Sequence, residues 1–189
     1  AQIELPSGYS LSIGGSAEEQ GDANSSLFAY APLLGLIMVA TVVLSFRSFI
    51  LAALLALVVG LCSGIGFFAI WVSGYPFGFQ PLIGTAGLIG LGINNSIIVL
   101  AAIRENGRAR VGEVGGIVEA VSGSTRHILS TTFTTIGGFL PLLLAPGDFW
   151  PPLAVVIAGG VAGSTVVALF FVPASYRLLW LPQRLLGRS

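Results

Sequence analysis

Charge is scarce in this sequence, and lysine is absent from it. Charged residues make up 8% of the 189 residues, whereas soluble globular domains contain roughly 25%. Hydrophobic residues make up 54%, and the mean hydropathy is +0.94. A soluble fold could not hide this much apolar surface, so the composition indicates a membrane protein. The formal net charge is zero and gives no indication of a nucleic-acid partner.

Side chains that bind metals or do covalent chemistry are equally rare. Cys62, His127 and Met38 are each the single residue of their type. Cys62 lies in an apolar run, where a thiol behaves as a small apolar side chain, and we interpret His127 as an interfacial residue rather than a proton relay. Phosphate-binding loops, metal-ligand spacings and nucleophilic triads are also absent. We therefore predict neither an enzyme nor a cofactor site.

Five long uncharged runs dominate the chain. They cover residues 27–46, 49–73, 77–103, 128–146 and 151–176. A bilayer core about 30 Å thick requires ~20 helical residues. The runs are apolar on every face, whereas the strands of a membrane barrel would be about 10 residues long with polar alternation. The sequence therefore predicts an all-α membrane protein, a bundle of five transmembrane helices that form one module over residues 27–176.

The basic residues all fall on one side of these spans. They are Arg47, Arg104, Arg108, Arg110, Arg126, Arg177, Arg184 and Arg188. Because arginine is retained on the cytoplasmic side, we expect a periplasmic N-terminus and a cytoplasmic C-terminus in the bacterial inner membrane. The opposite side carries acidic residues and two short turns, residues 74–76 and 147–150.

The segments outside the spans complete the expected organisation. Residues 1–26 contain no span, yet an exterior N-terminus requires an earlier one. We therefore expect them to be the end of a periplasmic porter or docking domain, with a short strand at residues 9–13 and a helix capped at residues 16–19. Residues 104–126 predict a cytoplasmic loop with a short surface helix, and residues 177–189 a cytoplasmic tail.

The third span carries two adjacent amides, Asn94 and Asn95. At the helical period, Asn94 shares a face with Gly84 and Gly87. It lies ten residues before Arg104, ~15 Å from the charged boundary and close to the bilayer midplane. The amides could simply bond neighbouring helices, which contributes about 0.6–2 kcal/mol. Alternatively, they line an ion or proton pathway through the bundle.

The fourth span has a matching polar stripe at Thr131 and Thr135. Thr135 is nine residues from Arg126, ~13 Å deep and level with Asn94. A hydrogen bond between Thr135 and Asn94 is therefore one expectation. The alternative is that these hydroxyl groups bond to carbonyls of their own helix, as Ser and Thr in membrane helices often do.

Small residues recur at spacings that allow close helix packing. The candidate packing glycines are Gly60, Gly64, Gly84, Gly87, Gly90, Gly159 and Gly163. Their specificity for any one function is low.

Several motifs together resemble the second membrane half of resistance-nodulation-division (RND) exporters of the acriflavine-resistance type. They are GINNSIIVL at 92–100, ENG at 105–107, RHILSTT at 126–132, GFLP at 138–141, WPPLA at 150–154, GG at 159–160, ST at 164–165 and VPASY at 172–176. LPSGY at 5–9 and FRSF at 46–49 match as well. The resemblance covers nearly the whole chain.

The resemblance implies the last five spans of a proton-driven inner-membrane exporter of small hydrophobic or amphiphilic compounds. Such exporters are homotrimers that work with a periplasmic adaptor and an outer-membrane channel. Asn94 stands where many drug exporters have a lysine, and Ser124 where a relay arginine often sits, whereas Thr131 matches the relay threonine. The implied proton relay then includes Asn94, Asn95, Thr131 and Thr135, with its acidic partners on the upstream membrane half.

Two alternatives remain open. One is a membrane scaffold or assembly subunit of the same fold that moves no ions. The other is a metal-ion exporter, which the single methionine disfavours for copper or silver, because those ions prefer thioether ligands.

The arginine distribution makes a topological prediction that uses single cysteines in a Cys62→Ala background. Cysteines at residues 74–78 or at Asp148 should react with a membrane-impermeant maleimide in cells with a permeable outer membrane. A cysteine at Arg108 should react only after the inner membrane is opened. Reaction at Arg108 from the periplasmic side would contradict the five-span topology.

Overall fold

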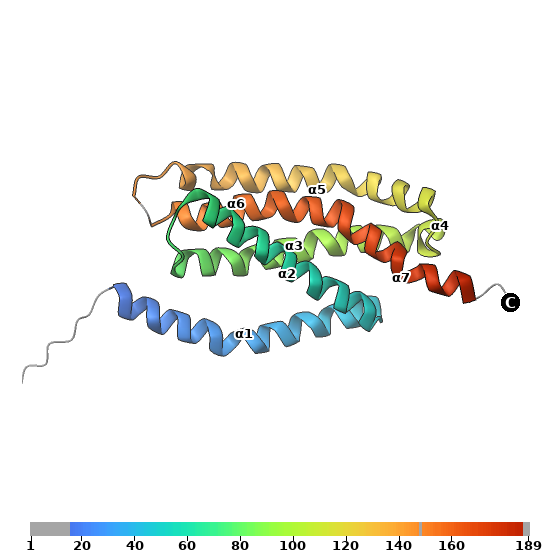
Figure 1. Ribbon diagram of the computed structural model, residues 1–189, viewed down its shortest axis with the longest axis horizontal. Coiled ribbons are helices and arrows are strands. Elements are labelled where there is room, and N and C mark those ends of the chain that lie inside the picture. The colour runs from blue at the N-terminus through green and yellow to red at the C-terminus, as the bar shows by residue number, and fades with distance from the viewer. Residues whose placement is uncertain (1–15, 148, 187–189) are drawn as a thin grey trace, which may run out of the picture.

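Helices account for the regular structure of the described chain. The computed structural model describes residues 16–147 and 149–186 (Figure 1). Its elements are α1 (Ser16–Phe46), α2 (Phe49–Ser73), α3 (Phe79–Glu105), α4 (Gly107–Arg110), α5 (Val114–Leu143), α6 (Pro151–Val166), the π-helix η1 (Val167–Phe171) and α7 (Val172–Leu186). No strand occurs within those two ranges, which confirms the all-α prediction. The strand expected at residues 9–13 lies outside them.

Local signals fix both ends of α2. The Ser48 hydroxyl oxygen accepts a hydrogen bond from the backbone N–H of Leu51, as an N-cap residue does. Gly74 ends the helix in the left-handed conformation at φ 75°, which costs little without a Cβ atom. Arg47 also has a positive φ, 46°, so the chain reverses sharply between α1 and α2.

Helix α6 is the centre of the bundle and packs against α2, α3 and α5. Its small residues make this possible. A Cβ atom at Gly159 would lie 2.7 Å from the Cβ atom of Ala69 on α2. Cβ atoms at Gly160 and Gly163 would overlap Leu88 on α3 and Ile65 on α2. The absence of side chains at these glycines therefore brings three helices into direct contact.

The apolar segment that begins with α6 continues without a break through η1 into α7. Pro173 explains the change of helix type, because its nitrogen cannot donate to the carbonyl four residues earlier. The N–H of Val172 instead bonds to the carbonyl of Val167, five residues back, as in a π-helix. The wide turn lets the chain pass the proline while remaining helical.

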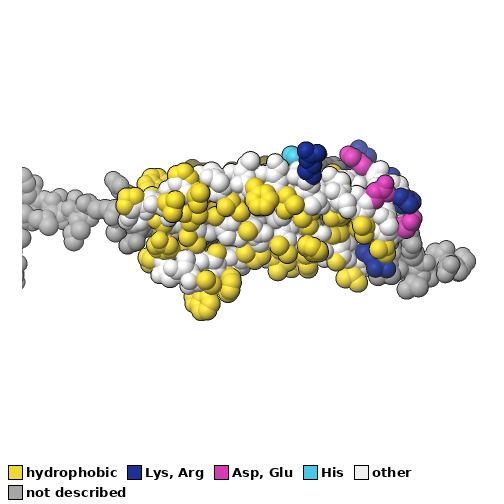
Figure 2. Space-filling view, turned by 90° about the horizontal axis from the view of Figure 1, so that it is seen from above, with side chains coloured by type: hydrophobic (Ala, Val, Ile, Leu, Met, Phe, Trp, Pro, Cys, Tyr) yellow, Lys and Arg dark blue, Asp and Glu magenta, His cyan; other side chains and the backbone are white. Residues whose placement is uncertain are grey.

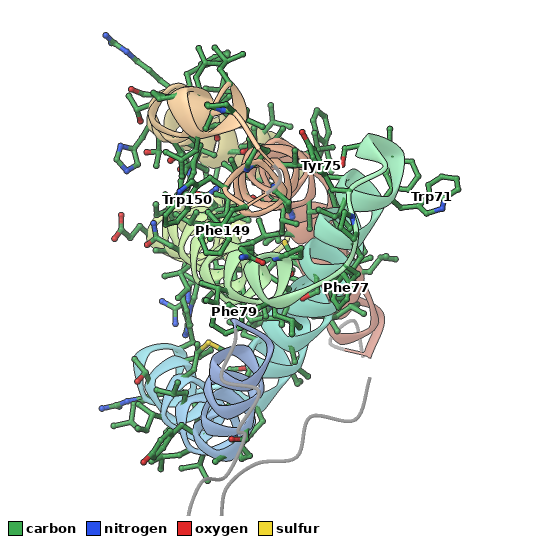
Figure 3. All side chains as sticks on the ribbon, turned by 90° about the vertical axis from the view of Figure 1, so that its left-hand side faces the viewer. Trp71, Tyr75, Phe77, Phe79, Phe149 and Trp150 are labelled. Atoms are coloured by element: carbon green, nitrogen blue, oxygen red, sulfur yellow. The ribbon has the colours of Figure 1, made fainter. Side chains whose placement is uncertain are left out.

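Helix α1 lies at the edge of the bundle, packed mainly against α2 (Figures 1 and 3). Large apolar side chains such as Leu34, Leu36 and Leu44 are more than half exposed on it. Exposed apolar residues are stable in a bilayer, where lipid tails surround them. They also leave room for contact with further membrane helices.

Composition agrees with membrane insertion. Three segments are long and apolar enough to cross a bilayer: Phe49–Ser73, Phe79–Glu105 and Pro151–Trp180. Within α1, Pro32–Leu44 is a shorter apolar stretch. Helix α5 is not among the three, and it carries Glu119, Arg126 and His127 as well as several Ser and Thr residues. The membrane character is thus confirmed, while the count of five spans stays a prediction.

The two ends of the bundle differ in chemistry. Figure 2 shows charged side chains over the end formed by α4 and the start of α5, and apolar side chains over the rest of that face. Aromatic residues gather at the opposite end, among them Trp71, Tyr75, Phe77 and Trp150 (Figure 3). We call these the arginine end and the aromatic end. Arginine and aromatic side chains are both typical of membrane boundaries.

The structure differs from the expected loop at residues 104–126. Most of this segment is helical, and α5 begins at Val114, so the predicted surface helix is continuous with the fourth span. The short helix α4 is capped by the side-chain oxygen (Oδ1) of Asn106, which accepts from the backbone N–H groups of Arg108 and Ala109. Arg108 in turn pairs with Glu119 at 2.5 Å.

Two neighbouring glycines at the start of α5 provide a matched test of this packing. A Cβ atom at Gly116 would overlap the backbone of α4 at Arg108 and Ala109, whereas one at Gly115 would lie 3.6 Å from the Glu113 carboxylate. Gly116→Ala should destabilise the protein by about 1–3 kcal/mol through overpacking. Gly115→Ala should be neutral or stabilise it by about 0.5–1 kcal/mol. Thermal unfolding in detergent measures both, and equal midpoints would contradict the close contact.

Candidate functional site

One face of α3 is left uncovered by the other helices. Ile83, Ala86, Gly87, Gly90 and Asn94 are exposed along it. The opposite face is buried against α2 and α6, where a Cβ atom at Gly92 would lie 2.7 Å from the Cys62 sulfur. Asn94 thus presents an amide on an otherwise apolar surface. Its side chain makes no hydrogen bond with any described residue.

The neighbouring amide has the opposite environment. Asn95 is 3% exposed, and its side chain also lacks a hydrogen bond within residues 16–147 and 149–186. Its level in the bundle follows from Gly92, whose Cβ atom would lie 3.6 Å from that of Ser164. Because α3 and α6 run parallel, Asn95 lies about one turn further along, beyond Ser164. An unsatisfied buried amide costs about 1–3 kcal/mol, so this site suits a water molecule or another polar partner.

A buried hydrogen bond links α5 and α6 near this level. The Thr132 and Thr165 hydroxyl oxygens lie 2.6 Å apart. Each oxygen also lies near a carbonyl of its own helix, with Thr132 2.8 Å from the Ile128 carbonyl and Thr165 2.9 Å from the Val161 carbonyl. Because each hydroxyl has one proton, one threonine donates to its own helix while the other donates across to it. The sequence interpretation did not assign these threonines to the site. Each of these threonines follows another hydroxyl-bearing residue, in the pairs 131–132 and 164–165, and this is the sequence feature that could have indicated them.

The threonines that were assigned lie on the flank of α5. Thr131 and Thr135 are half-buried. The Thr131 hydroxyl donates to the His127 carbonyl at 3.0 Å, which is the local bonding that the sequence left as an alternative. Thr135 has no hydrogen bond to a described residue, and the expected bond between Thr135 and Asn94 is not formed. His127 itself is exposed beside Arg126.

The candidate packing glycines divide into two groups. Gly84, Gly159 and Gly163 face other helices closely, with a Cβ atom at Gly84 only 3.1 Å from the Leu153 carbonyl oxygen. Gly60, Gly64, Gly87 and Gly90 face open space, so no described residue packs on them. Gly60 and Gly64 lie on the outer face of α2, and Gly87 and Gly90 on the uncovered face of α3. Packing at these four positions would require helices outside the described residues.

Cofactor and metal ligands are not gathered in this part of the chain. Within the described ranges, no group of three or more His, Cys, Asp or Glu side chains could hold a metal ion. The arrangement instead combines amides, hydroxyls and exposed backbone at the depth of the membrane. Polar groups of this kind can relay protons or bond an acid on another helix.

The chain resembles parts of known resistance proteins and of an efflux pump. It is 28% identical to the nickel and cobalt resistance protein CnrA of Cupriavidus metallidurans. That alignment covers 99% of this chain and 18% of CnrA. It is 33% identical to the multidrug resistance protein MdtC of Proteus mirabilis over 53% of the chain and 10% of that protein. The crystal structure of a heavy metal efflux pump superposes with a TM-score of 0.76 at 27% identity, over 93% of this chain and 18% of that one.

These proteins extend far beyond the aligned region, since the chain spans only 18% of the length of CnrA. The chain also matches the AcrB/AcrD/AcrF family over residues 1–180. That match covers almost the entire sequence and confirms the resemblance drawn from its motifs. The chain therefore belongs to the AcrB/AcrD/AcrF family, within the RND superfamily.

Proposed function

We propose that this chain forms the last five membrane spans of a proton-driven exporter, and that the uncovered face of α3 is where it meets the proton pathway. The observation that carries this proposal is the exposed Asn94 amide on an apolar helix face. Lipid cannot satisfy an amide, so the face requires a polar partner on another helix. The exposed Gly87 and Gly90 would let that helix approach closely.

The proposed pathway follows from the position of the polar groups. An acid on the covering helix would accept a hydrogen bond from the Asn94 amide when it is ionised. This bond stabilises the charged form, since a donor to a carboxylate lowers its proton affinity. Thr131 and Thr135, half-buried on the adjacent helix α5, could extend the chain of hydroxyls toward the arginine end. Proton transfer would then alternate with movement of the two membrane halves.

Relatives suggest a cargo, which we propose to be a divalent transition-metal cation. CnrA, which matches 99% of the chain, is named for nickel and cobalt resistance, whereas the multidrug resistance protein MdtC matches 53% of it. The scarcity of methionine argues against copper or silver only, because nickel and cobalt also accept nitrogen and oxygen ligands. Amphiphilic compounds remain the second candidate, supported by the identity to MdtC.

As in the family generally, we propose a homotrimer in the inner membrane with a periplasmic adaptor and an outer-membrane channel. The arginine end would face the cytoplasm. The described residues contain no metal cluster, so residues outside them would select the cargo.

The cargo proposal predicts which compounds become toxic when the full-length gene is deleted. Deletion should lower tolerance to nickel and cobalt and leave tolerance to lipophilic dyes unchanged, and the intact gene should restore it. Sensitivity to dyes alone would support the amphiphile alternative. Intact tolerance to both, together with loss of a partner complex, would support a scaffold.

The pathway proposal predicts a specific loss of coupling. Asn94→Leu in the full-length protein removes the amide, and the acid loses a hydrogen bond worth about 1.5–3 kcal/mol in its charged form. Proton release should slow, and cargo efflux under an imposed pH gradient should fall about tenfold or more at equal expression. Thr131→Val should give a smaller loss.

Thr134→Val is the matched control for Thr131→Val, because Thr134 is exposed and bonds only to the carbonyls of Ser130 and Thr131. It should transport like the parent. Normal efflux by Asn94→Leu would reduce Asn94 to a packing residue and remove it from the pathway.

A further inference from the structure

The arginine end contains a cavity that the export function does not use. Its volume is about 280 Å³. The cavity lies between the start of α2, the end of α3 with α4, and α7, and is lined by Ser48, Ile50, Leu51, Arg104, Arg110, Tyr176, Leu179 and Trp180. Charged, aromatic and apolar side chains therefore meet in one hollow at the membrane boundary.

The positive charge of this cavity is not neutralised within the described residues. Arg104 donates to the Phe46 carbonyl at 2.5 Å and lies 5.6 Å from the centre of the Phe46 ring, and neither contact removes its charge. Arg110 forms no ion pair with a described residue. Arg108, by contrast, is paired with Glu113 and Glu119 and does not line the cavity. The cavity thus concentrates two free cations, a setting that favours an anion.

Other groups in the cavity add to this preference. Ser48 and Leu51 mark the N-terminus of α2, where the helix dipole is positive. The Tyr176 hydroxyl donates to the Arg110 carbonyl at 3.3 Å, which ties α7 to α4. The Trp180 ring lies 6.0 Å from that of Tyr176. Tyrosine and tryptophan are enriched where membrane headgroups begin.

An apolar groove continues from the cavity along the surface of the bundle. Its volume is about 410 Å³, and it is lined by Ile50, Ala53, Leu54, Leu57, Ser175, Leu178 and Leu179. Ile50 and Leu179 line both hollows, so the groove begins where the cavity ends. From Ile50 to Leu57, α2 rises about 10 Å toward the aromatic end. A ligand that fills both hollows must have an anionic head and an apolar tail.

We propose that this pair of hollows binds one anionic phospholipid from the leaflet at the arginine end. Its phosphate lies between Arg104 and Arg110, and an acyl chain lies along the groove between α2 and α7. The groove distinguishes a lipid from free phosphate, which would leave it empty. The inference rests on the membrane placement proposed above and does not depend on the cargo or on proton coupling.

The test compares lipid binding to the purified full-length protein by native mass spectrometry. Phosphatidylglycerol should be retained more strongly than phosphatidylcholine, which has no net charge. Arg110→Gln should weaken phosphatidylglycerol binding about fivefold, the effect expected for one basic residue near an anionic lipid. Arg108→Gln is the matched control, since it removes the same charge from the same end, and it should change binding less than twofold by the same reasoning.

A second variant tests the groove. Ala53→Trp fills the groove from an exposed position and leaves both arginines in place, so it should also weaken phosphatidylglycerol binding. Soluble glycerophosphate should not compete with the lipid. Equal effects of Arg108→Gln and Arg110→Gln would show non-specific charge attraction and overturn the site. Competition by glycerophosphate together with unchanged binding by Ala53→Trp would assign the cavity to free phosphate instead. Export assays of the same variants report separately on the proposed function.

Discussion

The contact between Leu88 and the glycines that surround it determines the rest of the bundle. The Leu88 side chain is fully buried between α2 and α6, and Cβ atoms at Gly66 and Gly160 would both meet it. Apolar side chains gain little from leaving lipid, so helices in a bilayer associate through close packing rather than through the hydrophobic effect. The Leu88 side chain lies against Gly66 and Gly160, and this contact provides that packing. It sets the level at which α2, α3 and α6 meet, and with it the depth of every polar group on them.

This packing separates the two amides of α3. The face that contacts α6 includes Leu88, Gly92 and Ser96, and Asn95 is carried into the bundle beside it. Asn94 lies about 100° further round the helix and faces outward. The two adjacent asparagines therefore have different surroundings. Asn95 is enclosed near the hydrogen-bonded Thr132 and Thr165, while Asn94 is available to another helix. An amide exposed to lipid would be unstable, which is the reason for the covering partner proposed at that position.

The sequence predicted the features that depend on composition and period. Uncharged runs identified the helices, and the motifs identified the family, because both features consist of residues that are consecutive in the sequence. The sequence could not decide which side of α3 is buried, since Gly84 and Gly87 have the same composition signal and only Gly84 faces α6. It placed Asn94, rather than Asn95, on the packed face for the same reason. Pairs such as Thr132 and Thr165 are 33 residues apart and meet only through tertiary packing. The cavity at the arginine end likewise draws on α2, α3, α4 and α7.

The polar features lie at two separate depths, and this limits how they can act on each other. The uncovered amide of Asn94 is ten residues from Arg104, a distance of about 15 Å along α3. A headgroup held by Arg104 and Arg110 could not contact Asn94, because packed apolar side chains such as Leu100 and Ile103, both fully buried, lie along α3 between them. Helix α3 is the element that joins the two sites, since it carries both Asn94 and Arg104. A lipid that joins α2, α3 and α7 at one end would hold these helices together and would leave the uncovered face of α3 free to change partners in the proposed transport cycle.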